Sequence, residues 1–205
     1  MPYIFGAFCI IPVGGTFYRL AQIIQEGQWW PRFNPVVVDN FPLFIHGVSM
    51  VIFLVLGALQ FSVTGPFAQR QLHRILGRIA GLGAVIGGLS GVWMTLAHVE
   101  ISSPLLLIGR LFFGTAMAAF AIFAIWEAMH RNLVSHRNWI IRSYAIAFNA
   151  ASLPLLTLSI SLVILIIQDP APIIEDAIHL LGWIINLIVA EKFFVRRVIN
   201  KGALV

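Results

Sequence analysis

Charged residues are scarce in this 205-residue chain. Lys, Arg, Asp and Glu make up 10% of it and hydrophobic residues 60%, whereas a soluble domain carries about 25% charged residues. The mean hydropathy is +0.93. These values exclude a soluble domain and predict an integral membrane protein, with a length that suits one bundle of several spans. The net charge of +5 then reflects membrane topology and does not indicate a nucleic-acid partner.

Other absences narrow the chemistry. Cys9 is the only cysteine, which excludes an internal disulfide and a cysteine-based metal cluster. There is no Gly-rich phosphate loop, no H-E-x-x-H and no nucleophile elbow, so nothing supports nucleotide or hydrolytic chemistry. The amino-terminal run MPYIFGAFCIIPVGG lacks a basic region and a small-residue cleavage site, and we expect it to be a retained span.

Long apolar runs are what the sequence does have. A helix needs about 20 residues to cross a hydrocarbon core of about 30 Å, and six runs are long enough. Because the runs are continuous, they predict an all-α transmembrane bundle that forms a single domain over residues 1–205. The predicted spans cover residues 3–24, 42–64, 76–98, 104–129, 139–167 and 176–195.

The charges between these spans sort by side. If successive spans alternate in direction, ten of the 13 basic residues fall on one face of the membrane and six of the eight acidic residues on the other. The positive-inside rule then places both termini in the cytoplasm. The ten basic residues are Arg70, Arg74, Arg78, Arg131, Arg137, Arg142, Lys192, Arg196, Arg197 and Lys201.

The six histidines lie near the ends of the predicted spans. Paired histidines on facing helices hold b-type haems in membrane bundles, and a neutral imidazole also suits Cu, Zn or Fe. An interfacial histidine with no ligand is the plainer alternative for each. The external side receives His46, His98 and His179, and the cytoplasmic side receives His73, His130 and His136. We take His46 as the best single candidate for a haem or metal ligand.

The best histidine pair is His73 with His136. Each precedes a helix that enters from the cytoplasmic side, and each is followed by an arginine, so we expect the two rings to lie close together. Arg74 and Arg137 would then crowd positive charge, which Glu191, a lipid phosphate, a haem propionate or a partner's acidic patch would balance. The remaining histidines, His98, His130 and His179, are weaker candidates.

Two arginines lie inside predicted spans. Arg19 and Arg110 are each about a turn and a half from the external end. An arginine within the membrane is costly unless it faces a partner or a wet cavity, so both are candidates to bind a cofactor; snorkelling to the interface is the alternative. We expect both to face the bundle interior and to share a partner. In the third span, Gly83, Gly87 and Gly91 recur at small-xxx-small spacing, which suits helix packing or a flat ligand.

Several motifs together resemble a known family. The runs LHRILGRIAGLGAVIGGLSGVWMTL, GRLFFGTAMA, HRNWIIRSYAIAF and GWIINLIVAE are similar to the predicted membrane proteins of domain of unknown function 2306, as are PLFIHGVSMVIFLVLGALQFS and GGTFYRL. The resemblance implies a multi-pass protein of a bacterial cytoplasmic membrane and supplies no activity. The motifs contain Arg19, His46, His73, Arg74, Arg78, Arg110, His136, Arg137, Arg142, Asn186 and Glu191. The three weaker histidines, His98, His130 and His179, lie outside them.

Three classes of function remain open. The first is a b-type haem or metal-binding redox component that exchanges electrons with quinone. The second is a non-catalytic accessory subunit packed against a larger respiratory or photosynthetic complex. The third is a small transporter or assembly factor with a polar path along Arg19 and Arg110.

Overall fold

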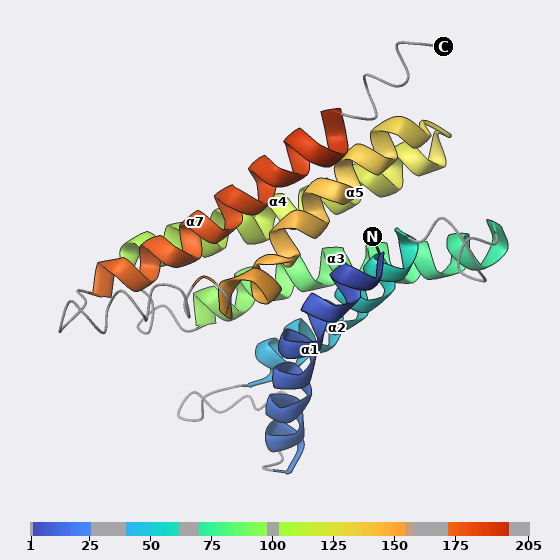
Figure 1. Ribbon diagram of the computed structural model, residues 1–205. Coiled ribbons are helices and arrows are strands. Elements are labelled where there is room, and N and C mark those ends of the chain that lie inside the picture. The colour runs from blue at the N-terminus through green and yellow to red at the C-terminus, as the bar shows by residue number, and fades with distance from the viewer. Residues whose placement is uncertain are drawn as a thin grey trace.

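The computed structural model describes residues 2–25, 40–61, 70–97, 103–154, 156 and 172–196, and every regular element among these residues is helical. The predicted all-α fold is therefore confirmed for this part of the chain. In order, the elements are α1 (Pro2–Gln25), α2 (Phe41–Gln60), α3 (Arg70–Ala97), α4 (Pro104–Met129), α5 (Leu133–Ala147), α7 (Pro172–Ala190) and the π-helix η3 (Glu191–Val195) (Figure 1).

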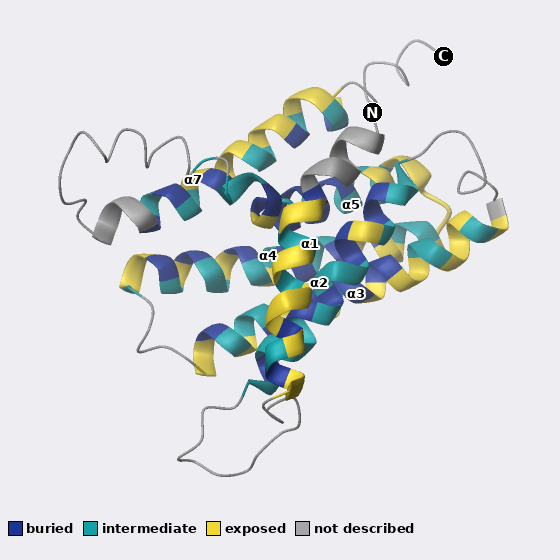
Figure 2. Ribbon diagram, turned by 60° about the horizontal axis from the view of Figure 1, so that its bottom comes forward, coloured by how far each residue is buried: buried dark blue, intermediate teal, exposed yellow. Residues whose placement is uncertain are grey.

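Four helical stretches are long and apolar enough to cross a membrane, namely Phe41–Gln60, Gln71–Ala97, Pro104–Met129 and Asp176–Val195. Exposed and buried residues alternate along them (Figure 2), and many of the exposed ones are large and apolar, as lipid-facing positions require. The predicted span 3–24 coincides with α1, and the predicted span 139–167 overlaps α5, with residues 155 and 157–167 outside the described residues. The six-span count and the orientation stay predictions.

Two helices begin about two turns earlier than the apolar runs do. The third starts at Arg70 rather than at residue 76, and the fifth at Leu133 rather than at residue 139. With 28 residues, α3 is about 42 Å long, more than the hydrocarbon core of about 30 Å. Its polar first turns can extend beyond the core without breaking the helix. His73 and His136, expected to precede these helices, are each the fourth residue of their helix.

The connection from α4 to α5 is only three residues long. Arg131 has a positive φ of 61°, and its N–H donates to the Ala128 carbonyl while the Asn132 N–H donates to the Glu127 carbonyl. This pattern closes the carboxyl end of α4 in a Schellman motif. The Asn132 side chain then accepts from the Ser135 N–H and starts α5. Residues 133–137, which lie between the predicted spans 104–129 and 139–167, are thus helical.

The fifth predicted span is not one continuous helix. After α5 ends at Ala147, helix resumes at residues 149–154. At the interruption the Ala151 N–H donates to the carbonyl of Phe148, a tighter i to i−3 turn. The break lies six residues before Pro154, so the proline is not at the interruption itself.

Tyr144 of α5 lies at the centre of the core. Its ring meets Phe53 and Phe61 edge to face at centroid distances of 5.5 and 5.1 Å. Its hydroxyl donates to the Leu54 carbonyl at 2.9 Å, which gives a buried polar group the partner that the membrane interior cannot supply. A β-carbon at Gly57 would lie 2.5 Å from the Tyr144 ring, so α2 approaches α5 only because this residue is glycine.

The glycines of α3 pack against two neighbouring helices. A β-carbon at Gly83 would lie 3.1 Å from the Ser49 carbonyl of α2, and one at Gly88 would lie 2.7 Å from the Gly114 carbonyl of α4. Close backbone approach of this kind is the usual role of small-xxx-small spacing in membrane helices. Of the two uses that the sequence leaves open, the structure shows helix packing.

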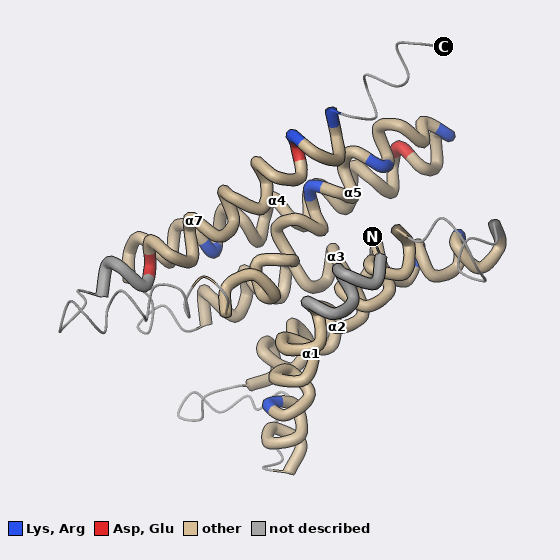
Figure 3. The backbone as a smooth tube through the Cα atoms, viewed as in Figure 1, with Lys and Arg blue, Asp and Glu red and all other residues tan. Residues whose placement is uncertain are grey.

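Basic residues gather at one end of the helices. In Figure 3 they mark the start of α3, the turn between α4 and α5, and the end of α7. Alternating helix directions bring these points together, as the sequence predicts. That this end faces the cytoplasm stays a prediction from the positive-inside rule.

Candidate functional site

His46 lies in the second turn of α2 and packs across the glycine face of α3. Its Nδ1 is 2.9 Å from the Gly87 carbonyl oxygen, so Nδ1 carries the proton and donates it. A β-carbon at Gly91 would lie 3.1 Å from Cε1 of the ring, so glycine gives the imidazole its space. With Nδ1 protonated, Nε2 of the neutral ring holds a lone pair that can bind a metal or accept a hydrogen bond.

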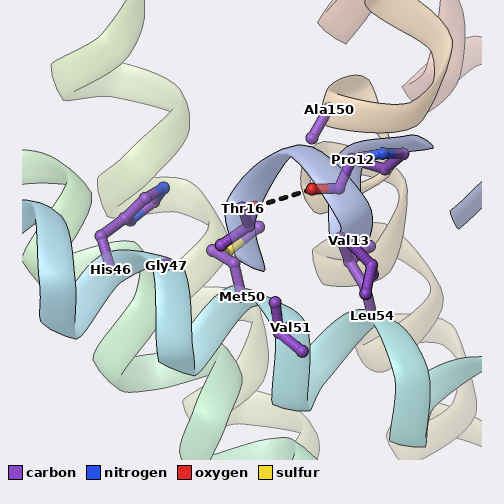
Figure 4. Close-up of a pocket in the computed structure, with 9 residues that line it drawn as sticks. All are labelled: Pro12, Val13, Thr16, His46, Gly47, Met50, Val51, Leu54 and Ala150. Carbon is purple, nitrogen blue, oxygen red and sulfur yellow. Dashed lines mark hydrogen bonds between the residues drawn. The ribbon is translucent and has the colours of Figure 1, made fainter. Parts of the chain in front are cut away.

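A cavity of about 90 Å³ opens beside His46, between α1, α2 and the segment that contains Ala150 (Figure 4). Thr16 also lines it, and its hydroxyl donates to the Pro12 carbonyl at 2.7 Å. Met50 lies one turn further along α2, and its sulfur would be 2.9 Å from a β-carbon at Gly87. Pockets for drug-sized ligands enclose about 300–1,000 Å³. This cavity suits an ion or a few waters, and it is too small for a haem.

His73 and His136 lie near the starts of α3 and α5, at the end where the basic residues gather. The two imidazoles, from α3 and α5, are close enough for their charges to interact. His136 is half-buried, and its Nδ1 donates to the Ala124 carbonyl of α4 at 2.8 Å. This bond fixes the tautomer that leaves Nε2 as the ligand atom, as in most metal-binding histidines. His73 is exposed. The site of His46 is separate, because Gly87 lies 14 residues, about 21 Å, along α3 from His73.

The weaker histidine candidates do not join this pair. His130 is exposed, stacks on Trp126 at a centroid distance of 4.5 Å and bonds to the carbonyl of the same residue. His179 lies in the first half of α7, 12 residues before Glu191. His98 lies outside the described residues.

The two intramembrane arginines have different surroundings. Arg19 is exposed and donates to the Gln22 side chain of its own helix at 3.2 Å. The expectation that it faces the bundle interior is wrong, since a residue so near the helix end can point its long side chain outward. Arg110 is half-buried and lies within electrostatic range of Asp176 in α7. Asp176 is buried and accepts a hydrogen bond from Ser103, the N-cap of α4.

Glu191 is held by Arg142. The guanidinium donates from Nε and Nη2 to the two carboxylate oxygens, each at 3.0 Å, and stacks 4.8 Å from the centroid of Trp139. Glu191 is therefore not the counter-charge of Arg74 and Arg137 that the sequence suggests. Neither of these arginines forms an ion pair within the described part of the chain.

Sequence reasoning missed Tyr144, Met50 and the Arg142–Glu191 pairing. Met50 is one helical turn from His46, and this spacing alone indicates that the two side chains lie on the same face of a helix. The other two depend on which helices adjoin, which periodicity does not reveal. Among the described residues, no group of three or more His, Cys, Asp or Glu side chains is placed to hold a metal ion.

Comparison with known proteins gives one match. Residues 43–194 match the family described as predicted membrane protein (DUF2306). The chain belongs to this family. The matched residues contain His46, His73 and His136, whereas Arg19 precedes them. This membership makes the chain a membrane protein and assigns it no activity. No curated protein and no solved structure matches it.

Proposed function

We propose that this DUF2306 member is a haem b-binding redox component of a bacterial inner membrane, with His73 and His136 as the axial ligands. The observation that carries the proposal is that the two rings, from different helices, lie within electrostatic range of each other at one end of the helices, with Nδ1 of His136 donating to the Ala124 carbonyl. A bis-imidazole haem needs one ligand from each side and Nε2 free on each ring.

The surrounding charge also fits a haem. Arg74 and Arg78 of α3 and Arg137 of α5 are exposed and make no ion pair within the described residues. Haem propionates are carboxylates, which arginine binds through charge-assisted hydrogen bonds. When bound, haem b supplies one-electron transfer, for which a quinone in the bilayer is the partner we propose. The chain itself would position the two imidazoles and balance the propionate charge.

Absorption spectra of the purified protein test this proposal. We expect a Soret band in the wild-type protein, and its loss in His73→Ala and His136→Ala with the helical circular dichroism retained. His130→Ala is the matched control, because this exposed ring lies at the same end and contacts its own helix; its Soret band should be unchanged. A Soret band that survives both ligand substitutions would refute the assignment.

The same basic end supports a second candidate function, that of an accessory subunit of a larger membrane complex. Unpaired exposed arginines would fit an acidic patch on a partner. In that case Arg74→Ala and Arg137→Ala would loosen co-purification of a partner, while no visible absorption would be present to change. The spectrum of the wild-type protein separates the two functions.

A further inference from the structure

His46 and Met50 are four residues apart in α2 and line the same cavity. Figure 4 shows their side chains rising from the same side of successive turns. Both lie against Gly87 of α3, His46 through its hydrogen bond to the carbonyl and Met50 through its sulfur. The Gly87 contact uses Nδ1 of His46, so Nε2 is the ring nitrogen left for the cavity that both side chains line.

The nitrogen of His46 that remains available is Nε2. Because Nδ1 donates to the Gly87 carbonyl, Nε2 has the lone pair, and it makes no hydrogen bond with any described residue. A backbone carbonyl at Nδ1 is the usual second partner of a metal-binding histidine, since it fixes the ring and raises the basicity of the other nitrogen. Thr16, the remaining polar residue of the cavity wall, has its proton committed to Pro12.

The donor set selects one class of occupant. The cavity wall holds one imidazole, one thioether and one hydroxyl, and no carboxylate. Magnesium and calcium require oxygen ligands, whereas thioether sulfur favours soft ions such as Cu(I). A single positive charge is also less costly than a double one within a membrane helix bundle. The volume of about 90 Å³ has room for an ion and a few waters.

We propose that His46 and Met50 form a binding site for Cu(I), separate from the histidine pair that we assign to haem. Nε2 of His46 and the sulfur of Met50 are the protein ligands. Binding involves no change of oxidation state and no covalent step. The site is independent of the proposed function, because it uses other residues and the cavity is too small for a haem.

Competition with the chromogenic Cu(I) chelator bicinchoninate, under anaerobic reducing conditions, tests the site in the detergent-purified full chain. We expect one Cu(I) per chain. Met50→Leu, which preserves volume, should weaken binding by more than about tenfold, and His46→Gln should abolish it. Met129→Leu is the matched control, because Met129 is an exposed methionine at the end of α4; its affinity should equal that of the wild-type protein.

X-ray absorption of the wild-type Cu(I) complex keeps the test independent of any folding defect in the variants. A sulfur shell together with a nitrogen shell would support the site, and a shell of oxygen and nitrogen alone would overturn it. Wild-type protein that takes up no Cu(I) from the chelator would also overturn it, as would variants that bind as wild type. The haem content of Met50→Leu should be unchanged, so failure here and failure of the haem assignment are distinguishable.

Discussion

Arg142 and Glu191 form a two-pronged ion pair that joins α5 to the start of η3, with both nitrogen–oxygen distances at 3.0 Å. The side chains are 25% and 38% exposed, so the pair is partly screened by solvent or headgroups. A single-turn π-helix is often found at a functional position, and here its first residue is the carboxylate partner of this pair.

Removing one partner of this pair should destabilise the fold. We expect Glu191→Gln to lower the free energy of unfolding by about 1–2 kcal/mol, less than the loss for a fully buried pair because both groups are partly exposed. Arg142→Lys should also destabilise the fold, because a lysine ammonium cannot donate two parallel hydrogen bonds to the two carboxylate oxygens. Thermal unfolding in detergent measures both. The exposed Arg137, which forms no ion pair among the described residues, gives the control Arg137→Lys, which should unfold as wild type; equal stability in all three variants would contradict this role.

The glycine beside Tyr144 should not tolerate a methyl group. In Gly57→Ala the new β-carbon would lie 2.5 Å from ring carbon Cε2, so the two helices must separate, and we expect a large drop in unfolding temperature. Gly14→Ala is the matched control, because nothing lies within 4 Å of its β-carbon position; alanine there should be neutral or stabilising by up to about 1 kcal/mol.

The clash at Gly57 involves the ring and not the hydroxyl. Tyr144→Phe removes the hydroxyl, and with it the hydrogen bond to the Leu54 carbonyl and the contact with Cys9 Sγ, at a cost of about 1–3 kcal/mol. It should therefore not rescue Gly57→Ala. Recovery of the wild-type unfolding temperature in the double variant would show that the contact is misassigned.

Replacing Arg131 with glycine should stabilise the protein. Its positive φ of 61° costs an ordinary residue about 1 kcal/mol, a cost that glycine does not bear. Arg131→Gly should unfold at a higher temperature than Arg131→Ala, which loses the same charge and keeps the strained backbone. The reverse order would mean that the Schellman turn between α4 and α5 does not form as described.

The orientation in the membrane rests on the gathering of basic residues at one end. Both termini should be cytoplasmic, with six spans. A reporter that is active only in the periplasm, fused after Val205, should be silent, and the same reporter inserted between residues 99 and 103 should be active. Activity of the carboxyl-terminal fusion would reverse the topology.

Hydropathy predicted the ends of a helix correctly where the apolar run and the helix end at the same residues. The helix α4 begins at Pro104 and ends at Met129, as predicted. Its start is fixed because the Ser103 hydroxyl accepts a hydrogen bond from the Leu106 N–H. The starts of α3 and α5 were missed, because their first turns are polar and still helical. Hydropathy reports the hydrocarbon depth and not the helix end.

Only part of the candidate sites could be predicted from the sequence. The pairing of His73 with His136 followed from loop positions and span direction, and the structure places the two rings within electrostatic range. The contact of His46 with Gly87 requires the register between α2 and α3, which small-residue spacing allows but does not specify. Arg19 was misread because a position inside an apolar run does not say which way the side chain points.

The haem content of the wild-type protein tests the central claim most directly. The protein should be purified in mild detergent from haem-replete cells and its dithionite-reduced minus oxidised spectrum recorded. The account predicts one b-type haem per chain, because it assigns one pair of histidines, His73 and His136, as the axial ligands. A preparation that is folded by circular dichroism yet shows no Soret band, even after incubation with hemin, would contradict it.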